Sequence, residues 1–125
     1  MIQHFRAWDN RFSEFVEDFF VSKDGKIYKI SKDTGYSFAI SRETSDKVIL
    51  MQSTGLKDKN GVEIFEGDIV SIDTDEFDLL FVKYEVGIYC LMDDEGCAEY
   101  LSDYYNYVSV VGNIYENKEL LEEEE

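Results

Sequence analysis

Between residues 48 and 111, short apolar segments alternate with turns, and this alternation constrains the fold more than any other feature of the sequence. The segments are 48–53, 68–73, 77–85, 87–92, 97–102 and 107–111. They are rich in β-branched and aromatic residues, which favour strands, and turns separate them about every 8–12 residues. Short strands at this spacing are typical of a sandwich or a small barrel. About five strands in about 70 residues favour a small SH3-like β-barrel.

The composition also predicts a mainly β chain. Of its 125 residues, 44% are hydrophobic and 15% are aromatic, so the chain can bury a core. Alanine, the best helix former, occurs only at Ala7, Ala39 and Ala98. There is no proline, which excludes polyproline docking segments. The one helical element that we expect is a short turn at 117–121, with Asn117 as its cap.

A β-hairpin is predicted near the N-terminus. Residues 18–22 and 27–30 have the composition of strands, and Asp24-Gly25 between them is a pair that readily forms a tight turn. Residues 10–17 fit both a helical stripe of apolar side chains and two strand faces. Helix and strand therefore both stay open for that segment.

A polar stretch at 31–46 follows the hairpin and holds at most one weak strand, at 36–40. We place the boundary between an N-terminal arm and the main domain near residue 47, where the charge balance also changes. The predicted parts are the arm (1–47), the SH3-like β-barrel domain (48–121) and an acidic tail (122–125).

Residues 54–70, TGLKDKNGVEIFEGDIV, hold the densest run of turn-forming residues. Asn60 and Gly61 readily accept positive φ, so residues 58–61 are predicted to form a tight turn. A second corner is expected at Glu66-Gly67-Asp68, with Asp68 bonding nearby backbone amides. We therefore interpret the segment as two structural corners. The alternative, in which Glu66 and Asp68 project into a cleft, stays open.

The net charge of −16 is unevenly distributed. Residues 1–50 hold eight Lys and Arg against eight Asp and Glu, whereas residues 51–125 hold four against twenty, so the second part carries 4 − 20 = −16. Such a surface repels phosphates, which makes direct binding of nucleic acid by this part unfavourable. The acidic surface of residues 51–125 either keeps the protein soluble or attracts a partner with a basic face. No apolar run approaches the about 20 residues of a membrane span, and the N-terminus does not resemble a secretory signal.

Catalytic and metal-binding patterns are scarce. His4 is the only histidine, Cys90 and Cys97 have no further Cys or His ligand near them, and no phosphate-binding loop motif occurs. We expect both cysteines to be free, partly buried thiols. The acidic segments at 73–78 and 93–95 are predicted to be solvated turns. The expectation is no enzyme, no catalytic residues, no metal and no cofactor.

Four blocks of the sequence resemble the signature of the YopX family, small proteins encoded by bacteriophages and prophages. They occur in the expected order and are FRAWD (5–9), MQSTGLKDKNG (51–61), IFEGDIV (64–70) and VVGNIYENKELL (110–121). Ser53 and Lys118 depart from the expected pattern. The residues that we assign to the structural signature are Trp8, Asp9, Gly55, Asn60, Gly61, Gly67, Asp68, Gly112 and Asn113. The resemblance implies a C-terminal SH3-type barrel and a bacterial cytoplasm, but no enzymatic activity.

The function predicted from these observations is that of a noncatalytic phage or prophage accessory protein that binds another protein with a basic or aromatic face. The candidate partner-binding residues are Glu66, Asp93, Asp94, Tyr104, Tyr105 and Tyr107. Tyrosine is enriched in interfaces because it joins an apolar ring to a polar tip. The alternative is an acidic DNA mimic that inhibits a nucleic-acid-binding enzyme of the host. Self-association through strand edges of the arm also stays open.

Overall fold

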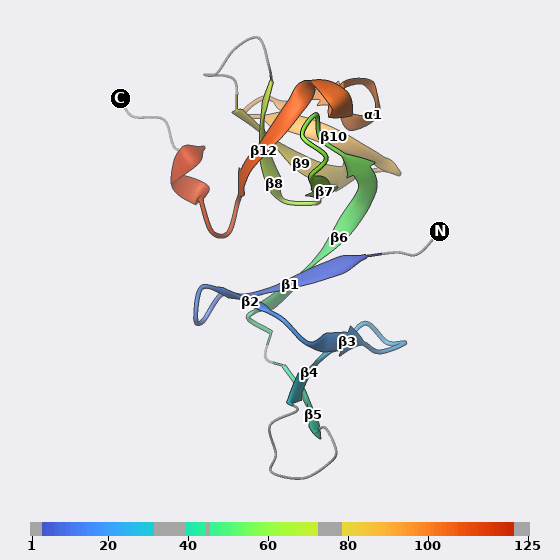
Figure 1. Cartoon of the computed structure of the whole chain (residues 1–125), viewed down its shortest axis with the longest axis vertical. Coiled ribbons are helices and arrows are strands. Elements are labelled where there is room, and N and C mark those ends of the chain that lie inside the picture. Colours follow the sequence, from blue (N-terminus) through green and yellow to red (C-terminus); the bar gives the residue numbers. More distant parts are fainter. Residues whose placement is uncertain (1–3, 32–39, 45, 73–78, 122–125) are drawn as a thin grey trace. The chain divides into compact units, whose positions relative to one another are not determined.

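The computed structural model describes residues 4–31, 40–44, 46–72 and 79–121 (Figure 1). The chain divides into two compact units. We call residues 6–50 the small unit, and residues 1–5 together with 51–125 the barrel unit. The strand β6 (Val48–Lys57) runs through the boundary between them, so the two units are joined by continuous extended chain.

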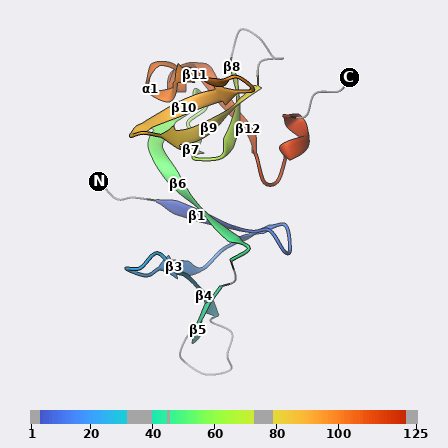
Figure 2. The same cartoon turned by 180° about the vertical axis from the view of Figure 1, so that it is seen from behind.

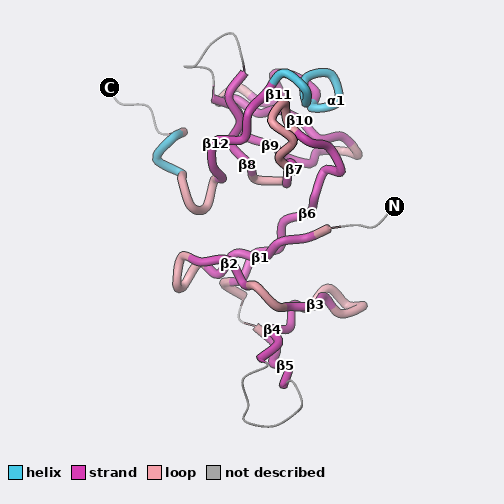
Figure 3. Tube along the Cα trace, viewed as in Figure 1, coloured by secondary structure: helices cyan, strands magenta, loops and turns pink. Residues whose placement is uncertain are grey.

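The small unit consists of short antiparallel strands (Figure 3). They are β1 (Phe5–Asp9), β2 (Glu14–Val16), β3 (Phe19–Val21), β4 (Ile27–Ser31) and β5 (Ile40–Glu43). β1 pairs with β2, and β4 lies between β3 and β5 in a three-stranded sheet. Ala7, Val16 and Val48 are buried together, with Phe19 and Ile27 packed against them. This is a small core, as its length allows.

The predicted hairpin is confirmed as β3 and β4, with Gly25 at φ +85° in the turn. The segment 10–17 contains no helix: it makes a turn in which Ser13 has φ +52° and then enters β2. Val16 is buried in β2 while Phe12 stays 65% exposed, so the apolar residues here do not form one helical face. Of the weak strand expected at 36–40, only Ile40 lies among the described residues, at the start of β5.

The barrel unit is built on a five-stranded antiparallel sheet, which Figure 2 shows from behind. Its order is β11-β10-β9-β8-β12. The strands are β8 (Asp68–Ile72), β9 (Leu79–Glu85), β10 (Ile88–Asp93), β11 (Gly96–Tyr100) and β12 (Val108–Asn113). The short strand β7 (Glu63–Phe65) pairs with the second part of β6.

The sheet curls into a half-barrel, and the predicted small β-barrel fold is confirmed. The last strand, β12, returns to pair with the first strand of the sheet, β8. Two short helices, α1 (Leu101–Tyr104) and the 3₁₀ helix η1 (Tyr105–Tyr107), lead from the edge strand β11 to β12.

The core of the barrel unit comes from alternate positions of its strands. Its buried residues are Ile64, Val70, Leu80, Val82, Leu91, Leu101 and Val108. Full burial of such a side chain stabilises a fold by about 1.5–3 kcal/mol. The alternation also decides the other face: residues 88, 90 and 92 of β10 point away from Leu91, since successive side chains of a strand point to opposite faces.

Three sequence predictions were wrong in detail. The strand expected at 97–102 ends at Tyr100, because Leu101 is fully buried and the chain turns into α1 to place it in the core. Tyr107, expected in a strand, belongs to η1. The helical turn near the C-terminus is confirmed as the 3₁₀ helix η2 (Lys118–Leu120), but Asn117 makes no side-chain cap. No helix among the described residues is long and apolar enough to cross a membrane.

Candidate functional site

The first predicted corner is organised by the buried carboxylate of Asp58, which is only 5% exposed. Its Oδ1 accepts hydrogen bonds from the backbone amides of Asn60 (2.8 Å) and Val62 (2.9 Å). Its Oδ2 accepts one from the amide of Val110 in β12, at 2.8 Å. Gly61 completes the turn at φ +82°. The corner is therefore a tight turn whose acid ties it to the last strand.

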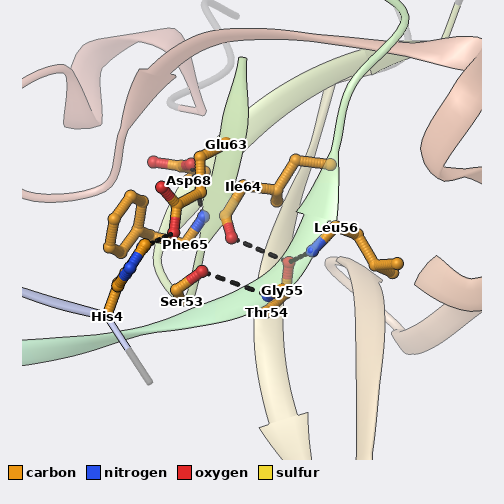
Figure 4. Close-up of polar contacts among 9 residues, drawn as sticks. All are labelled: His4, Ser53, Thr54, Gly55, Leu56, Glu63, Ile64, Phe65 and Asp68. Atoms are coloured by element: carbon orange, nitrogen blue, oxygen red, sulfur yellow. Dashed lines mark hydrogen bonds and ion pairs between the residues drawn. The ribbon is translucent and has the colours of Figure 1, made fainter. Parts of the chain in front are cut away.

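Between this turn and the boundary, β6 bulges, and side chains satisfy the backbone there (Figure 4). The Ser53 hydroxyl accepts a hydrogen bond from the amide of Gly55 at 3.1 Å. The Thr54 hydroxyl donates to the carbonyl of Ile64 at 2.7 Å and accepts from the amide of Leu56 at 3.2 Å. Gly55 itself has φ +78°, which favours glycine.

The second corner is closed by Asp68 and Gly67. Asp68 is 1% exposed, and its Oδ2 accepts a hydrogen bond from the amide of Phe65 at 2.8 Å (Figure 4). Gly67 has φ +90°, and an added Cβ would lie 3.2 Å from Sδ of Met51. Both corners consequently use their conspicuous residues to shape the chain, and Asp68 does not project into a cleft.

A polar cluster joins His4, Ser53 and Glu63 (Figure 4). His4 Nδ1 lies 3.0 Å from Oε2 of Glu63. A hydrogen bond from the Ser53 hydroxyl, and then the bond and charge of His4, lower the pKa of Glu63. In a nucleophile–base–acid relay the histidine stands between the hydroxyl and the acid. Here the carboxylate stands between them, so the order of groups differs from that relay.

The C-terminal signature block is a third corner. The Asn113 side chain, 4% exposed, accepts hydrogen bonds from the amides of Tyr115 (3.0 Å) and Glu116 (2.8 Å). Oδ1 of Asn117 accepts one from the amide of Asn113 at 3.2 Å. An added Cβ on Gly112 would lie 2.6 Å from that same Oδ1, so the close approach requires glycine.

Two signature residues lie in the small unit. Trp8 is 1% exposed, makes an edge contact with Phe15 at a centroid distance of 4.9 Å, and its Nε1 donates to Asn10 Oδ1 at 3.4 Å. The guanidinium of Arg11 donates to both oxygens of Asp9, at 3.1 and 2.8 Å. Within their unit these residues are structural.

Among the predicted partner-binding residues, Asp93 and Asp94 lie at a pocket of about 450 Å³, which we call the acidic pocket. Its lining is Ile72, Leu79, Leu80, Phe81, Met92, Asp93, Asp94, Ala98, Glu99 and Leu121. Asp93 and Asp94 are exposed, and Asp93 Oδ1 accepts a hydrogen bond from the amide of Glu95 at 2.8 Å. Seven of the ten lining residues are thus apolar, and the other three carry carboxylates.

The other predicted partner residues do not line this pocket. Tyr104 and Tyr105 are half-buried and pack against the barrel core, whereas Tyr107 is 56% exposed. Glu66 is half-buried at another place in the barrel unit. Burial of the Tyr89 and Tyr115 hydroxyls raises the pKa of both, and the negative charge of Glu66 raises them further. The predicted set is therefore divided among separate places of the barrel unit.

Sequence reasoning missed Glu99, Phe81 and Met92 as members of the acidic pocket. The alternation of 77–85 had already put Phe81 and Leu79 on one face, and this was the available signal. Nothing local indicated Glu99, since its place follows from the pairing of β11 with β10. Among the described residues, no group of three His, Cys, Asp or Glu side chains is placed to hold a metal ion.

Comparison with known proteins identifies a family and similar solved structures. The model of the YopX protein family matches residues 4–122. The crystal structure of protein EF1440 from Enterococcus faecalis is 32% identical, with a TM-score of 0.66 over 98% of this chain and 99% of that one. The structure of protein yopX from Bacillus subtilis is 20% identical, with a TM-score of 0.60 over 94% and 97%. No curated protein matches the chain.

Proposed function

The chain belongs to the YopX family, and from this premise we propose that it is a noncatalytic accessory protein of a bacteriophage or prophage that binds another protein in the host cytoplasm. The partner presents a basic or aromatic side chain to the acidic pocket. The phage setting, the compartment and the protein-binding role are parts of this proposal.

The observation that carries the proposal is the chemistry of the acidic pocket. Leu79, Phe81 and Met92 offer apolar contact, while Asp93, Asp94 and Glu99 supply negative charge. An arginine, a lysine or an aromatic residue joins an apolar body to a polar or cationic end, so it satisfies both halves of such a pocket. Burial of one such side chain in an interface centre is typical of a binding hot spot.

The noncatalytic part of the proposal is supported by how the signature acids are used. Asp58 and Asp68 are buried and accept hydrogen bonds from backbone amides, so neither is available to take a proton from a substrate. A general base needs access to the reacting group. Burial also removes these two acids from any surface that could mimic DNA.

The test is a pull-down from host lysate with wild-type protein and an Asp93→Asn/Asp94→Asn variant, followed by mass spectrometry. We expect one specific partner, weaker capture at high salt, and at least a tenfold loss of capture by the variant. The matched control is Glu14→Gln/Glu17→Gln, which removes the same charge from exposed positions of the small unit. It should capture the partner like wild type.

No specific partner in any sample would contradict the proposed function. An equal loss with the control variant would mean that only net charge matters and that the pocket does not bind. Recovery of a nucleic-acid-binding enzyme, displaced by duplex DNA, would favour the DNA-mimic alternative instead.

A further inference from the structure

The strand β11 (Gly96–Tyr100) has one open side. It is the last strand of the five-stranded sheet and pairs only with β10 among the described residues. Four of its five residues are exposed: Cys97, Ala98, Glu99 and Tyr100. An edge strand presents unpaired amide and carbonyl groups, which are a template for another extended chain.

Two pockets meet along this edge. The acidic pocket lies toward the Met92 end of β10. A second pocket of about 480 Å³ lies toward the β9–β10 turn and is lined by Glu85, Val86, Ile88, Cys90, Cys97, Ala98, Glu99 and Tyr100. Ala98 and Glu99 belong to both linings, so the two pockets adjoin at β11. We call the two pockets together the edge groove.

The turn between β9 and β10 lines one end of the edge groove and contains a residue with an unfavourable backbone conformation. Val86 is fully exposed, at 100%, and has φ +48°. A β-branched side chain is strained at positive φ, and an asparagine-glycine pair would suit this two-residue turn better. Exposed apolar area and backbone strain both cost stability, and such strain is found at functional positions.

The edge groove is negatively charged. Glu85, Asp93, Asp94 and Glu99 line it, and Glu95, next to Asp94 in the sequence, is exposed. Lys83 contacts this set through Oε1 of Glu85 at 3.2 Å. The pKa of Cys97 is raised to about 11, first by its hydrogen bond with Cys90 and by burial, and further by the charges of Glu85 and Glu99. An occupant with positive charge is complementary to this surface.

We propose that the edge groove binds an extended segment of the partner protein, in which Lys or Arg alternates with apolar residues, as an added strand beside β11. Backbone bonds to β11 give affinity, and alternate side chains supply apolar contact and positive charge. This inference rests on the proposed function and names the binding mode of the partner. A second copy of this chain is a poorer occupant, because pairing β11 with itself brings two copies of Glu99 and their acidic neighbours together.

The first test uses a labelled peptide, acetyl-Lys-Val-Lys-Tyr-Lys-Val-Lys-amide, titrated with the full chain by fluorescence anisotropy. Two further versions carry N-methyl groups at the odd or at the even positions. In a strand pair only every second residue directs its amide to the partner strand. We therefore expect one methylated version to lose at least tenfold in affinity and the other to bind like the parent. Amides of 96–100 should gain protection from hydrogen exchange on binding.

The second test uses Val86→Asn, which removes apolar area and accepts positive φ. We expect its melting temperature to rise by about 2–6 °C and its affinity for the peptide to fall at least threefold. A gain of stability together with a loss of binding cannot come from misfolding. Glu99→Gln should weaken binding in the same way, whereas Glu14→Gln should not change it.

Equal binding of both methylated peptides would overturn strand addition. It would mean that the pockets bind the peptide through its side chains alone. No binding of any peptide at millimolar concentration would also overturn it. The partner capture described above does not depend on this peptide, so it judges the proposed function separately. A stable dimer whose 96–100 amides are already protected would assign the edge to a second copy and overturn the inference.

Discussion

Asp58 accepts a hydrogen bond at 2.8 Å from the backbone amide of Val110, a residue 52 positions further along the chain. The same carboxylate holds the amides of Asn60 and Val62 in its own turn. One side chain thus fixes both the local turn and its attachment to β12. The conspicuous residues of the signature blocks are explained mainly by contacts of this kind.

Asp58→Asn should lower the free energy of unfolding by about 2–4 kcal/mol, since it replaces charge-assisted bonds and turns an amide group toward a backbone amide. Urea unfolding at neutral pH measures this value. Asp94→Asn, at an exposed position, is the control and should change it by less than about 0.5 kcal/mol. Equal effects of the two changes would refute the role assigned to Asp58.

The stability should depend on pH through the same group. Burial alone would raise the pKa of Asp58, but hydrogen bonds from Val110, Val62 and Asn60 outweigh it, and the pKa is lowered. Because the folded pKa lies below the unfolded value of about 3.9, the stabilisation is present above that pH. It is lost as pH falls through the folded pKa.

Urea midpoints measured between about pH 7 and about pH 2.5 test this dependence. The difference between wild type and Asp58→Asn should shrink as pH falls. The carboxyls of Asp9 and Glu63, whose pKa values are also lowered, are present in both proteins and cancel in the comparison. A difference that stays constant down to the lowest pH would show that Asp58 does not carry it.

Gly67→Ala and Gly61→Ala separate conformational strain from crowding. Both glycines have similar positive φ, +90° and +82°, so both changes should cost about 1–2 kcal/mol in backbone strain. An added Cβ at Gly61 meets open space, whereas at Gly67 it lies 3.2 Å from Sδ of Met51. Gly67→Ala should therefore cost about 1 kcal/mol more by urea unfolding. Equal losses would mean that Met51 moves aside freely.

Cys97 should react slowly despite its exposure. A hydrogen bond with Cys90, burial and nearby carboxylates raise its pKa to about 11, which leaves roughly 0.1% thiolate at pH 8. Iodoacetamide labelling, followed by mass spectrometry from pH 7 to pH 11, should accelerate over that whole range. Cys90→Ala removes the largest cause and should speed labelling at pH 8 several-fold. Fast labelling of wild type at pH 7 would contradict this account.

The sequence was sufficient for most strands of the barrel unit, for the tight turns and for the family. Their signals are local: short apolar segments such as 79–82, Asp24-Gly25 in the first hairpin, and the ordered signature blocks across the chain. A turn pair or a short apolar run bounded by turns restricts the backbone wherever it occurs, so no knowledge of the partner strand is needed. The interpretation of 54–70 as corners rested on the same chemistry.

Only the tertiary structure decided where the sites lie. It placed Glu99 beside Asp93 and Asp94, made two pockets adjoin at β11, and turned the chain at Leu101 into helices. These facts follow from strand register and from which side chain fills the core, and both are settled by packing between segments far apart in sequence. The sequence by itself determined the turns and the β segments; packing alone decided which strand edge stayed open and which carboxylates surround it.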